Sequence, residues 1–295
     1  MLKERGSVVS VQYGRLDVID GAFVLVDTYG VRTQIPVGGL ACVMLETGTT
    51  ITHEAVKLAS RVGCLLMWVA DGVGRVYASG AHGGARADRL LLQAKAAIDE
   101  SARLQVVREM YRLRFQQEPP KNRSVQQLRG IEGSRVRRMY ELLARQYRIP
   151  WNRRSYKVYD WNSADPVNRA LSTATASLYG VCEAAILIAG YSPAIGYIHT
   201  GKPLSFVYDI ADIFKFDTVV PAAFRTVARN SQSIERDTRI ACRDLFRSEK
   251  ILKRIVPVID RVIHASGLQP PQVQPDQLTP AIPNAGKLSD GSRNN

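Results

Sequence analysis

The chain has 295 residues, of which 45% are hydrophobic, and its 40 Lys and Arg outnumber its 27 Asp and Glu, so the formal net charge is +13. This length allows two domains and a sizeable core, and the positive charge is typical of proteins that bind nucleic acid, although a basic surface can serve solubility alone. The four scattered cysteines form no C-x-x-C pair, which argues against a disulfide framework and a cysteine zinc site and predicts a cytoplasmic protein. No apolar run approaches the roughly 18 residues of a membrane helix, which argues against a membrane span.

Residues 1–80 are predicted to form β structure, because short runs of β-branched and aromatic residues are separated by turn signals. Asp20 followed by Gly21, and Tyr29 followed by Gly30, are two of these signals. The expected strands span 8–13, 16–19, 22–27, 31–36, 40–45, 64–69 and 75–78, with a short helix at 53–61. Together these elements predict a small β-sandwich domain with one helix.

The glycine-rich stretch 79–84 is predicted to be a linker, and helical periodicity dominates residues 85–266. The first expected helix covers 85–117, with Leu91, Ala94 and Ile98 at helical spacing. The predicted fold class is therefore α+β, a small N-terminal β-sandwich domain (1–80) followed by a larger all-α domain (85–266).

Helix ends in the second region carry specific signals. A capping box, Ser124 with Gln127, opens one helix. Asp165 before Pro166 opens another, which Gly190 ends. This second helix is rich in small residues and can be packed closely from several sides, so we expect it at the centre of the helical domain.

The last helices are expected within 234–264, where Arg236, Arg239 and Arg243 share one face. Such a stripe suits phosphate groups, although a charged face is more often simply solvated. Residues 267–295 are rich in Pro, Gln and Asn, and this composition predicts a flexible tail that orders only on binding.

An apolar helical run at 204–216 follows a turn-like segment that begins at His199. Asp209 and Asp212 interrupt the run three residues apart and therefore share one face. Carboxylates in apolar surroundings need compensation, which a divalent cation shared with His199 or a paired arginine would provide. The first seven positions of a phosphate-binding loop also match here, but Pro203 stands where the loop needs Ser or Thr, so we reject that motif.

Glu132 lies between Gly130 and Gly133 inside a helical pattern, where each glycine costs roughly 1 kcal/mol against alanine. A close approach of another backbone, from a helix or a nucleic-acid strand, would explain these glycines. The alternative is a helix break with Glu132 paired to Arg135.

Several of these stretches together resemble the CRISPR-associated integrase family in its type I-E form. The likeness is carried by GIEGSR at 130–135, GYIHTGKPLSFVYDIADIFKFDTVVP at 196–221, CRDLFRS at 242–248 and QYGRLDVIDGAF at 12–23. It covers nearly everything except the tail, and the β-then-helical layout is the fold of that family.

The resemblance implies a catalytic metal site made of Glu132, His199 and Asp212, with Asp209 as a supporting residue that is not itself a ligand. Oxygen ligands with one imidazole favour Mg²⁺ or Mn²⁺ over zinc. The helical domain would then be the catalytic domain.

The resemblance also implies DNA contacts. Tyr13 matches a residue that stacks on the end of a captured duplex, and the implied phosphate contacts are Arg75, Arg236 and Arg239. Five residues match positions near a single-stranded DNA end: Tyr156, Trp161, Tyr179, Lys202 and Tyr208. Ordinary core packing is the alternative for the aromatic ones. In the tail, Ile282 matches a pocket-lining position, whereas the expected glutamine has no clean counterpart near Gln277.

The implied reaction inserts a captured DNA fragment as a new spacer at a CRISPR repeat, by attack of its 3′-hydroxyl on a phosphodiester. The implied DNA partners are double-stranded DNA with single-stranded 3′ ends and CRISPR repeat DNA. The implied protein partners are a second copy of the chain, with which it forms a homodimer, and a small ferredoxin-like adaptation protein. Two homodimers of this chain would flank one dimer of that small protein. A metal-dependent nuclease that acts on branched DNA without integration is the alternative activity. A non-catalytic basic scaffold is a third hypothesis, disfavoured because all three ligand types are present.

Overall fold

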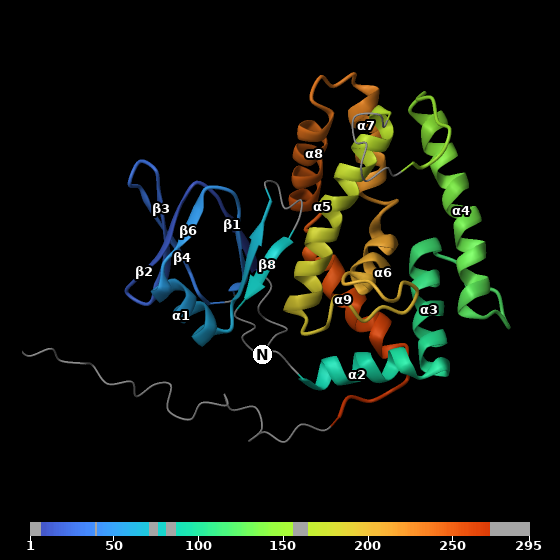
Figure 1. Cartoon of the computed structure of the whole chain (residues 1–295), viewed down its shortest axis with the longest axis horizontal. Helices are drawn as coiled ribbons and strands as arrows, with labels where there is room; N and C mark the ends of the chain where they lie inside the picture. The colour runs from blue at the N-terminus through green and yellow to red at the C-terminus, as the bar shows by residue number, and fades with distance from the viewer. Residues whose placement is uncertain (1–6, 39, 71–75, 81–86, 156–164, 272–295) are drawn as a thin grey trace, which may run out of the picture.

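The computed structural model describes residues 7–38, 40–70, 76–80, 87–155 and 165–271. Strands occupy the N-terminal part and helices the rest (Figure 1). The predicted α+β class, with a β region followed by a helical region, is confirmed.

Within the described residues the strands form two four-stranded sheets, ordered β1-β5-β7-β8 and β4-β3-β2-β6. The bounds of their elements are β1 Ser7–Val11, β2 Gly14–Ile19, β3 Ala22–Asp27, β4 Arg32–Ile35, β5 Leu40–Leu45, β6 Thr49–Ile51, α1 His53–Val62, β7 Leu65–Val69 and β8 Val76–Gly80. Strands β1, β5 and β7 run parallel, and β8 is antiparallel to β7. In the other sheet β2, β3 and β4 are an antiparallel meander, and β6 is parallel to β2.

The predicted strands recur within a few residues of their expected bounds, but β6 was missed. Its three residues are too short to show an alternating pattern. Leu16 and Phe23 are fully buried and pack with Val43 and Leu66, so the two sheets share one core as a sandwich. Asp20 and Gly21 both have positive φ, and this two-residue turn joins β2 to β3.

The helical region contains α2 Ala87–Ile98, α3 Glu100–Phe115, α4 Val125–Gln146, α5 Pro166–Ile188, α6 Ser205–Phe214, α7 Val219–Ala228, α8 Ile234–Ser248 and α9 Ile251–His264. The single helix expected at 85–117 is wrong, because it is two helices that meet at a steep angle (Figure 1). Asp99 caps the second one by accepting a hydrogen bond from the Ala102 N–H at 2.8 Å. After this turn, Leu91 and Ile98 lie on the exposed side of α2.

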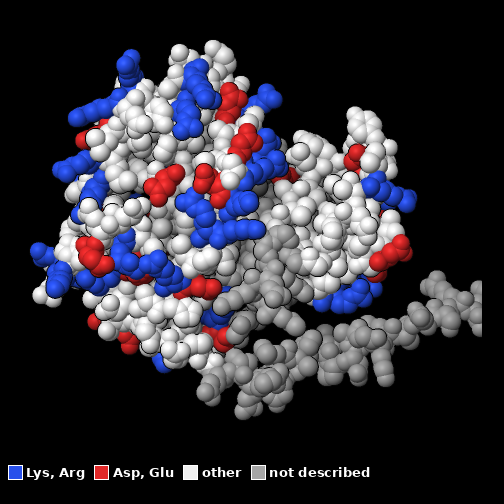
Figure 2. All heavy atoms as spheres, turned by 180° about the vertical axis from the view of Figure 1, so that it is seen from behind, with Lys and Arg blue, Asp and Glu red and all other residues white. Residues whose placement is uncertain are grey.

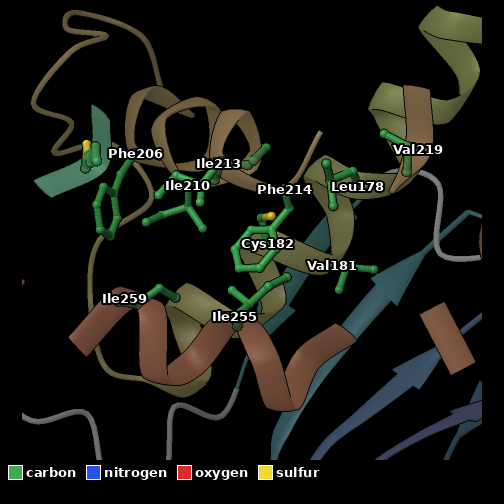
Figure 3. Packing of buried hydrophobic residues seen from close by; sticks show 14 of the residues in the cluster. Leu178, Val181, Cys182, Phe206, Ile210, Ile213, Phe214, Val219, Ile255 and Ile259 are labelled. Atoms are coloured by element: carbon green, nitrogen blue, oxygen red, sulfur yellow. The ribbon is translucent and has the colours of Figure 1, made fainter. Parts of the chain in front are cut away.

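Helix α5 is the centre of the helical region, as its small residues predicted. Asp165 accepts a hydrogen bond from the Asn168 N–H at its start, and Gly190 has a φ of 81° just after its end. Leu178 and Cys182 of this helix meet apolar side chains of α6 and α9, among them Phe214 (Figure 3). The four cysteines are buried and free, as expected.

Length and composition alone would let α5 span a membrane, contrary to the expectation that no apolar run is long enough. However, 67% of its most apolar window is buried inside the structure, as in the core helix of a helical domain. One such helix is weak evidence for a membrane span.

The end of α5 also packs against the first sheet. Ala184 is fully buried among Met44 of β5 and Met67 of β7. The β region and the helical region therefore share apolar contacts in addition to their covalent connection. Ser79 and Gly80 of the predicted linker belong to β8, and its residues 81–84 lie outside the described residues, as does the tail beyond residue 271. The domain boundary stays a prediction.

Glu183 lies half-buried on α5, and this burial raises the pKa of its carboxyl to about 7. An unperturbed glutamate has a pKa of about 4.3. The folded state therefore binds more protons than the unfolded chain between these two values, so this group lowers stability as pH rises from about 4.3 to about 7. We expect Glu183→Gln to raise the Tm at pH 8 and to have a much smaller effect at pH 4.5, as measured by circular dichroism.

Glu141→Gln is the matched control, because Glu141 is exposed on α4 and loses the same charge. A Tm difference between wild type and Glu183→Gln that does not grow with pH would contradict the assignment.

Candidate active site

A pocket between α3, α4 and α6 brings together residues that are far apart in the sequence. Glu132 comes from α4, and Asp209 and Asp212 come from consecutive turns of α6. His199 reaches the pocket from the loop between α5 and α6, and Arg114 from the last turn of α3. The remaining walls are mostly apolar, so charged groups concentrate where the helices converge.

The buried carboxylate of Asp209 holds the loop that carries His199. Its Oδ2 accepts hydrogen bonds from the N–H groups of Tyr197 at 2.6 Å and Ile198 at 3.1 Å. Its Oδ1 accepts the N–H of His199 at 2.9 Å and lies 2.7 Å from Nδ1 of the same residue. Because a carboxylate only accepts hydrogen bonds, Nδ1 carries the proton, and Nε2 is the ring nitrogen left for a ligand in neutral imidazole.

Gly196 permits this loop to approach the start of α6. It is buried, and a Cβ atom at this position would lie 2.8 Å from the backbone carbonyl carbon of Ser205. Gly201, with a φ of 77°, forms the turn that the sequence predicted there. Backbone fit and the Asp209 hydrogen bonds therefore fix the position of His199 together.

Asp212 is compensated by two cations. Its Oδ1 lies 2.9 Å from Nζ of Lys215, and its Oδ2 lies 3.3 Å from Nη1 of Arg114. Burial alone raises the pKa of this carboxyl, but Lys215 and Arg114 outweigh it and hold the pKa below its usual value. The arginine pairing left open by the sequence is therefore present for Asp212.

Glu132 also pairs with Arg114, which contacts its Oε1 through the same Nη1 atom. The expected partner Arg135 instead places its guanidinium over the rings of Tyr111 and Phe115, at 5.3 Å and 5.1 Å from their centroids. The hypothesis of a helix break with a Glu132–Arg135 pair is therefore wrong.

Helix α4 runs unbroken through Gly130 and Gly133. A Cβ atom built at either glycine would meet nothing within 4 Å. No other backbone in the described chain approaches them, so the expected close approach of another helix is wrong. The approach of a nucleic-acid strand stays a prediction.

The donor atoms suit a divalent cation in type. Two carboxylate oxygens and one imidazole nitrogen face the pocket from three separate segments, and a positively charged nitrogen already lies on the oxygens of Glu132 and Asp212. Within the described chain, however, no three His, Cys, Asp or Glu side chains are gathered closely enough to hold a metal as they stand. The residue types fit Mg²⁺ or Mn²⁺, and the guanidinium of Arg114 lies between the carboxylates of Glu132 and Asp212.

Two tyrosines, Tyr179 and Tyr208, lie side by side next to His199, and we call this pair the tyrosine wall. The rings of Tyr179 and Tyr208 lie 4.9 Å apart, and Tyr208 is 5.7 Å from the imidazole of His199. Lys202 lies over Tyr208 and Lys215 over Tyr179, at 5.9 Å and 5.6 Å from the ring centroids. Both tyrosines are half-buried, so core packing alone does not enclose them.

Within the described part of the chain, the other predicted DNA contacts do not line the pocket. Tyr13 is 55% exposed in the turn between β1 and β2, and Arg236 is exposed on α8 while Arg239 is half-buried there. Arg75, Tyr156, Trp161, Gln277 and Ile282 lie outside the described residues. Lys and Arg gather over the helical part of the face in Figure 2, mixed with Asp and Glu. Exposed arginines follow one another along α4 and its flanks: Arg123, Arg129, Arg137, Arg138, Arg145 and Arg148.

Sequence reasoning missed Arg114 and Lys215. Lys215 is three residues after Asp212, and this helical spacing was a usable signal. Arg114 is 98 residues from Asp212 and 18 from Glu132, so no local pattern singles it out among the many arginines.

We expect Asp209→Asn to lower the free energy of unfolding by about 2–4 kcal/mol, because an amide cannot accept the set of hydrogen bonds that this carboxylate accepts. Asp217→Asn, at an exposed position just after α6, is the control and should change stability by less than about 0.5 kcal/mol. Urea denaturation followed by fluorescence measures both. Equal stabilities of the two variants would show that Asp209 does not hold the loop.

The model of the family described as CRISPR associated protein Cas1 matches residues 112–256, which include every residue of the pocket except Val107, Met110 and Tyr111. The chain is 61% identical over 98% of its length to "CRISPR-associated endonuclease Cas1" of Geobacter sulfurreducens, covering 94% of that protein. It is 58% identical to the protein of the same name from Escherichia coli K12, over 98% of this chain and 95% of that one.

A solved structure, "Crystal structure of TtCas1-DNA complex", is similar with a TM-score of 0.79 and 43% identity, covering 87% of this chain and 96% of that chain. The fold, the sequence identity of 61% and 58% over nearly the whole chain, and the structural match agree with the resemblance found in the sequence. The chain belongs to the CRISPR-associated Cas1 family.

Proposed function

We propose that this protein is a metal-dependent DNA endonuclease and integrase of CRISPR adaptation. The observation that carries the proposal is the convergence of Glu132, His199 and Asp212 on one pocket of a Cas1-family chain. Its relatives from Geobacter sulfurreducens and Escherichia coli are named endonucleases, and the related TtCas1 structure contains DNA, which supports an activity on DNA.

Glu132, His199 and Asp212 would hold Mg²⁺ or Mn²⁺ in this pocket. A bound ion of this kind polarises a phosphodiester and offsets charge on the attacking and leaving oxygens. Asp209 keeps Nε2 of His199 turned to the ligand side by fixing Nδ1, and Lys215 keeps Asp212 ionised. The chain itself therefore supplies the orientation and the protonation state of the ligands.

In the proposed reaction, the 3′-hydroxyl oxygen of a DNA fragment forms a new bond to phosphorus at the edge of a CRISPR repeat. The bond from phosphorus to the leaving 3′ oxygen breaks. The attacking hydroxyl loses its proton to solvent, and the leaving oxygen takes up a proton from solvent to become a new 3′-hydroxyl. Water in place of the hydroxyl gives hydrolysis, so integrase and nuclease share one site.

The tyrosine wall, with Lys202, suits the single-stranded 3′ end of the fragment. Stacking of a base on an aromatic ring is worth about 1–3 kcal/mol, and a lysine near the rings can meet the backbone phosphate. Tyr208 adjoins His199, so a strand held on this wall lies next to the proposed ligands.

We propose the remaining partners on the strength of the family resemblance. The chain forms a homodimer, and two such homodimers flank one dimer of a small ferredoxin-like adaptation protein. CRISPR repeat DNA is the target. A cytoplasmic location is part of the same proposal.

The test incubates the protein, the small partner and a duplex with 3′-hydroxyl ends with a supercoiled plasmid that carries a CRISPR array. Covalent joining of the duplex to the repeat supports integration. Nicking or cleavage of branched DNA without joining would favour the nuclease alternative. Products that form equally well in excess EDTA would contradict a metal-dependent site altogether.

We expect Glu132→Ala, His199→Ala and Asp212→Ala each to reduce strand transfer by at least about 100-fold, because each removes one proposed ligand. Glu141→Ala, on the exposed side of the same helix as Glu132, should retain activity. Gel assays of joining, with circular dichroism to check folding, provide the measurement. Near-normal joining by a folded ligand variant would remove that residue from the site.

We expect DNA binding to weaken steeply with salt, because the net charge of +13 and the exposed arginines of α4 and α8 release counterions from phosphates. With about 6–10 phosphate contacts, affinity should fall by about 10³–10⁵ between 50 and 200 mM salt. Fluorescence anisotropy with a labelled duplex measures this dependence. A nearly flat titration would contradict backbone-dominated binding.

A further inference from the structure

A single nitrogen atom lies between the two proposed carboxylate ligands. Nη1 of Arg114 contacts Oε1 of Glu132 and is 3.3 Å from Oδ2 of Asp212. The side chains of all three are largely buried, with 7%, 15% and 16% of their surfaces exposed. The guanidinium therefore occupies the place where a cation shared by these carboxylates would bind.

The two oxygens of Asp212 face different cations. Oδ1 faces Lys215, which follows on the same helix, whereas Oδ2 faces the pocket and Arg114. A divalent cation held by Glu132 and Asp212 in the pocket would compete with Arg114 for their oxygen atoms, whereas Lys215 contacts the other oxygen of Asp212. Arg114, but not Lys215, is in direct competition with a metal.

The bonding of Arg114 is also incomplete. Its Nε atom is buried and has no hydrogen-bond partner among the described residues. A buried donor without a partner is unfavourable, so the native position of this side chain is less stable than a fully bonded arginine would be. Arg114 lies in the last turn of α3, two residues before the left-handed residue Gln116, so it is close to the end of a helix.

We propose that Arg114 is an internal counter-ion that a divalent cation displaces. In the metal-free protein it neutralises Glu132 and Asp212 and keeps these like charges together. When metal binds, Arg114 leaves both oxygens. This inference rests on the proposed function, since it concerns regulation of the same site, and it makes the metal affinity of the free protein lower than its ligands alone would give.

A consequence is that DNA and metal binding assist each other. The displaced guanidinium needs a new anionic partner, and a DNA phosphate matches its planar, bidentate geometry. A strand that engages Arg114 removes the competitor and so raises the affinity for metal, and by linkage metal raises the affinity for DNA equally.

The test compares Mn²⁺ binding by full-length wild type and Arg114→Met, using electron paramagnetic resonance in the absence of DNA. We expect Arg114→Met to bind Mn²⁺ on the order of ten-fold more tightly, because the metal no longer has to break charge-assisted hydrogen bonds of the arginine. Arg129→Met is the matched control, because Arg129 lines the same pocket and no ion pair joins it to Glu132 or Asp212 in the described chain. Its Mn²⁺ affinity should rise by no more than the general effect of one lost positive charge, about two- to three-fold.

Thermal melts provide a second readout. In EDTA, Arg114→Met should unfold at a lower temperature than wild type, because the two carboxylates lose their shared cation. Saturating Mn²⁺ should then raise its Tm by more than it raises that of wild type. Arg114→Lys keeps the charge but loses the planar guanidinium and two of its five N–H donors, so its Mn²⁺ affinity should lie between those of wild type and Arg114→Met. This variant decides the question if Arg114→Met does not fold.

Three outcomes separate the inference from the proposed function. If wild type binds Mn²⁺, Glu132→Gln loses that binding, and Arg114→Met or Arg114→Lys binds no more tightly than Arg129→Met, the counter-ion role is wrong and the metal site stands. If neither wild type nor any Arg114 variant binds Mn²⁺ in a way that depends on Glu132, the proposed metal site itself fails. If the Arg114 variants alone bind more tightly, the inference is supported.

Discussion

The hydrogen bonds of the Asp209 carboxylate are the interaction on which the pocket depends. One buried anion on α6 gathers three consecutive N–H groups of the preceding loop and fixes Nδ1 of His199. Asp212 lies one turn further along the same helix, so α6 determines the position of both the imidazole and a carboxylate. Apolar packing of α6 against α5 and α9 then holds that pair in place relative to the rest of the helical region (Figure 3).

The charges of the pocket are balanced within the chain. Glu132 and Asp212 share Arg114, and Lys215 pairs with Asp212 from the opposite side. A structural metal site, in contrast, usually leaves its ligands uncompensated and its protein unfolded when the ion is absent. We therefore expect the helical core of this protein to fold without a metal ion. The stability of the fold then does not depend on the ion proposed for the reaction.

The sequence predicted the elements whose signals are local. Alternation and turn residues located most strands, and Asp165 with Gly190 located both ends of α5. The break between α2 and α3 was missed because apolar residues at helical spacing continue on both sides of Asp99. The sequence alone does not show that the chain turns there and that Asp99 caps a new helix. The three-residue β6 is defined by pairing with β2, a long-range property.

The site shows the same division. Glu132, Asp209 and Asp212 stood out because charge within a helical apolar pattern, or between two glycines, needs an explanation. Nothing in the sequence shows which of the many arginines lies near those carboxylates, so Arg114 was identified only from the structure.

Helix α4 carries one more consequence. Gly130 and Gly133 have open space around them and contribute no side-chain packing, so Ile131 and the contact between Glu132 and Arg114 attach this turn to its neighbours. The buried side chains of Leu128 and Tyr140 anchor the helix on either side of that turn. Loss of the contact between Glu132 and Arg114 would therefore leave Ile131 as the apolar side chain that attaches this turn to the helical core, while the two ends of α4 keep their own anchors.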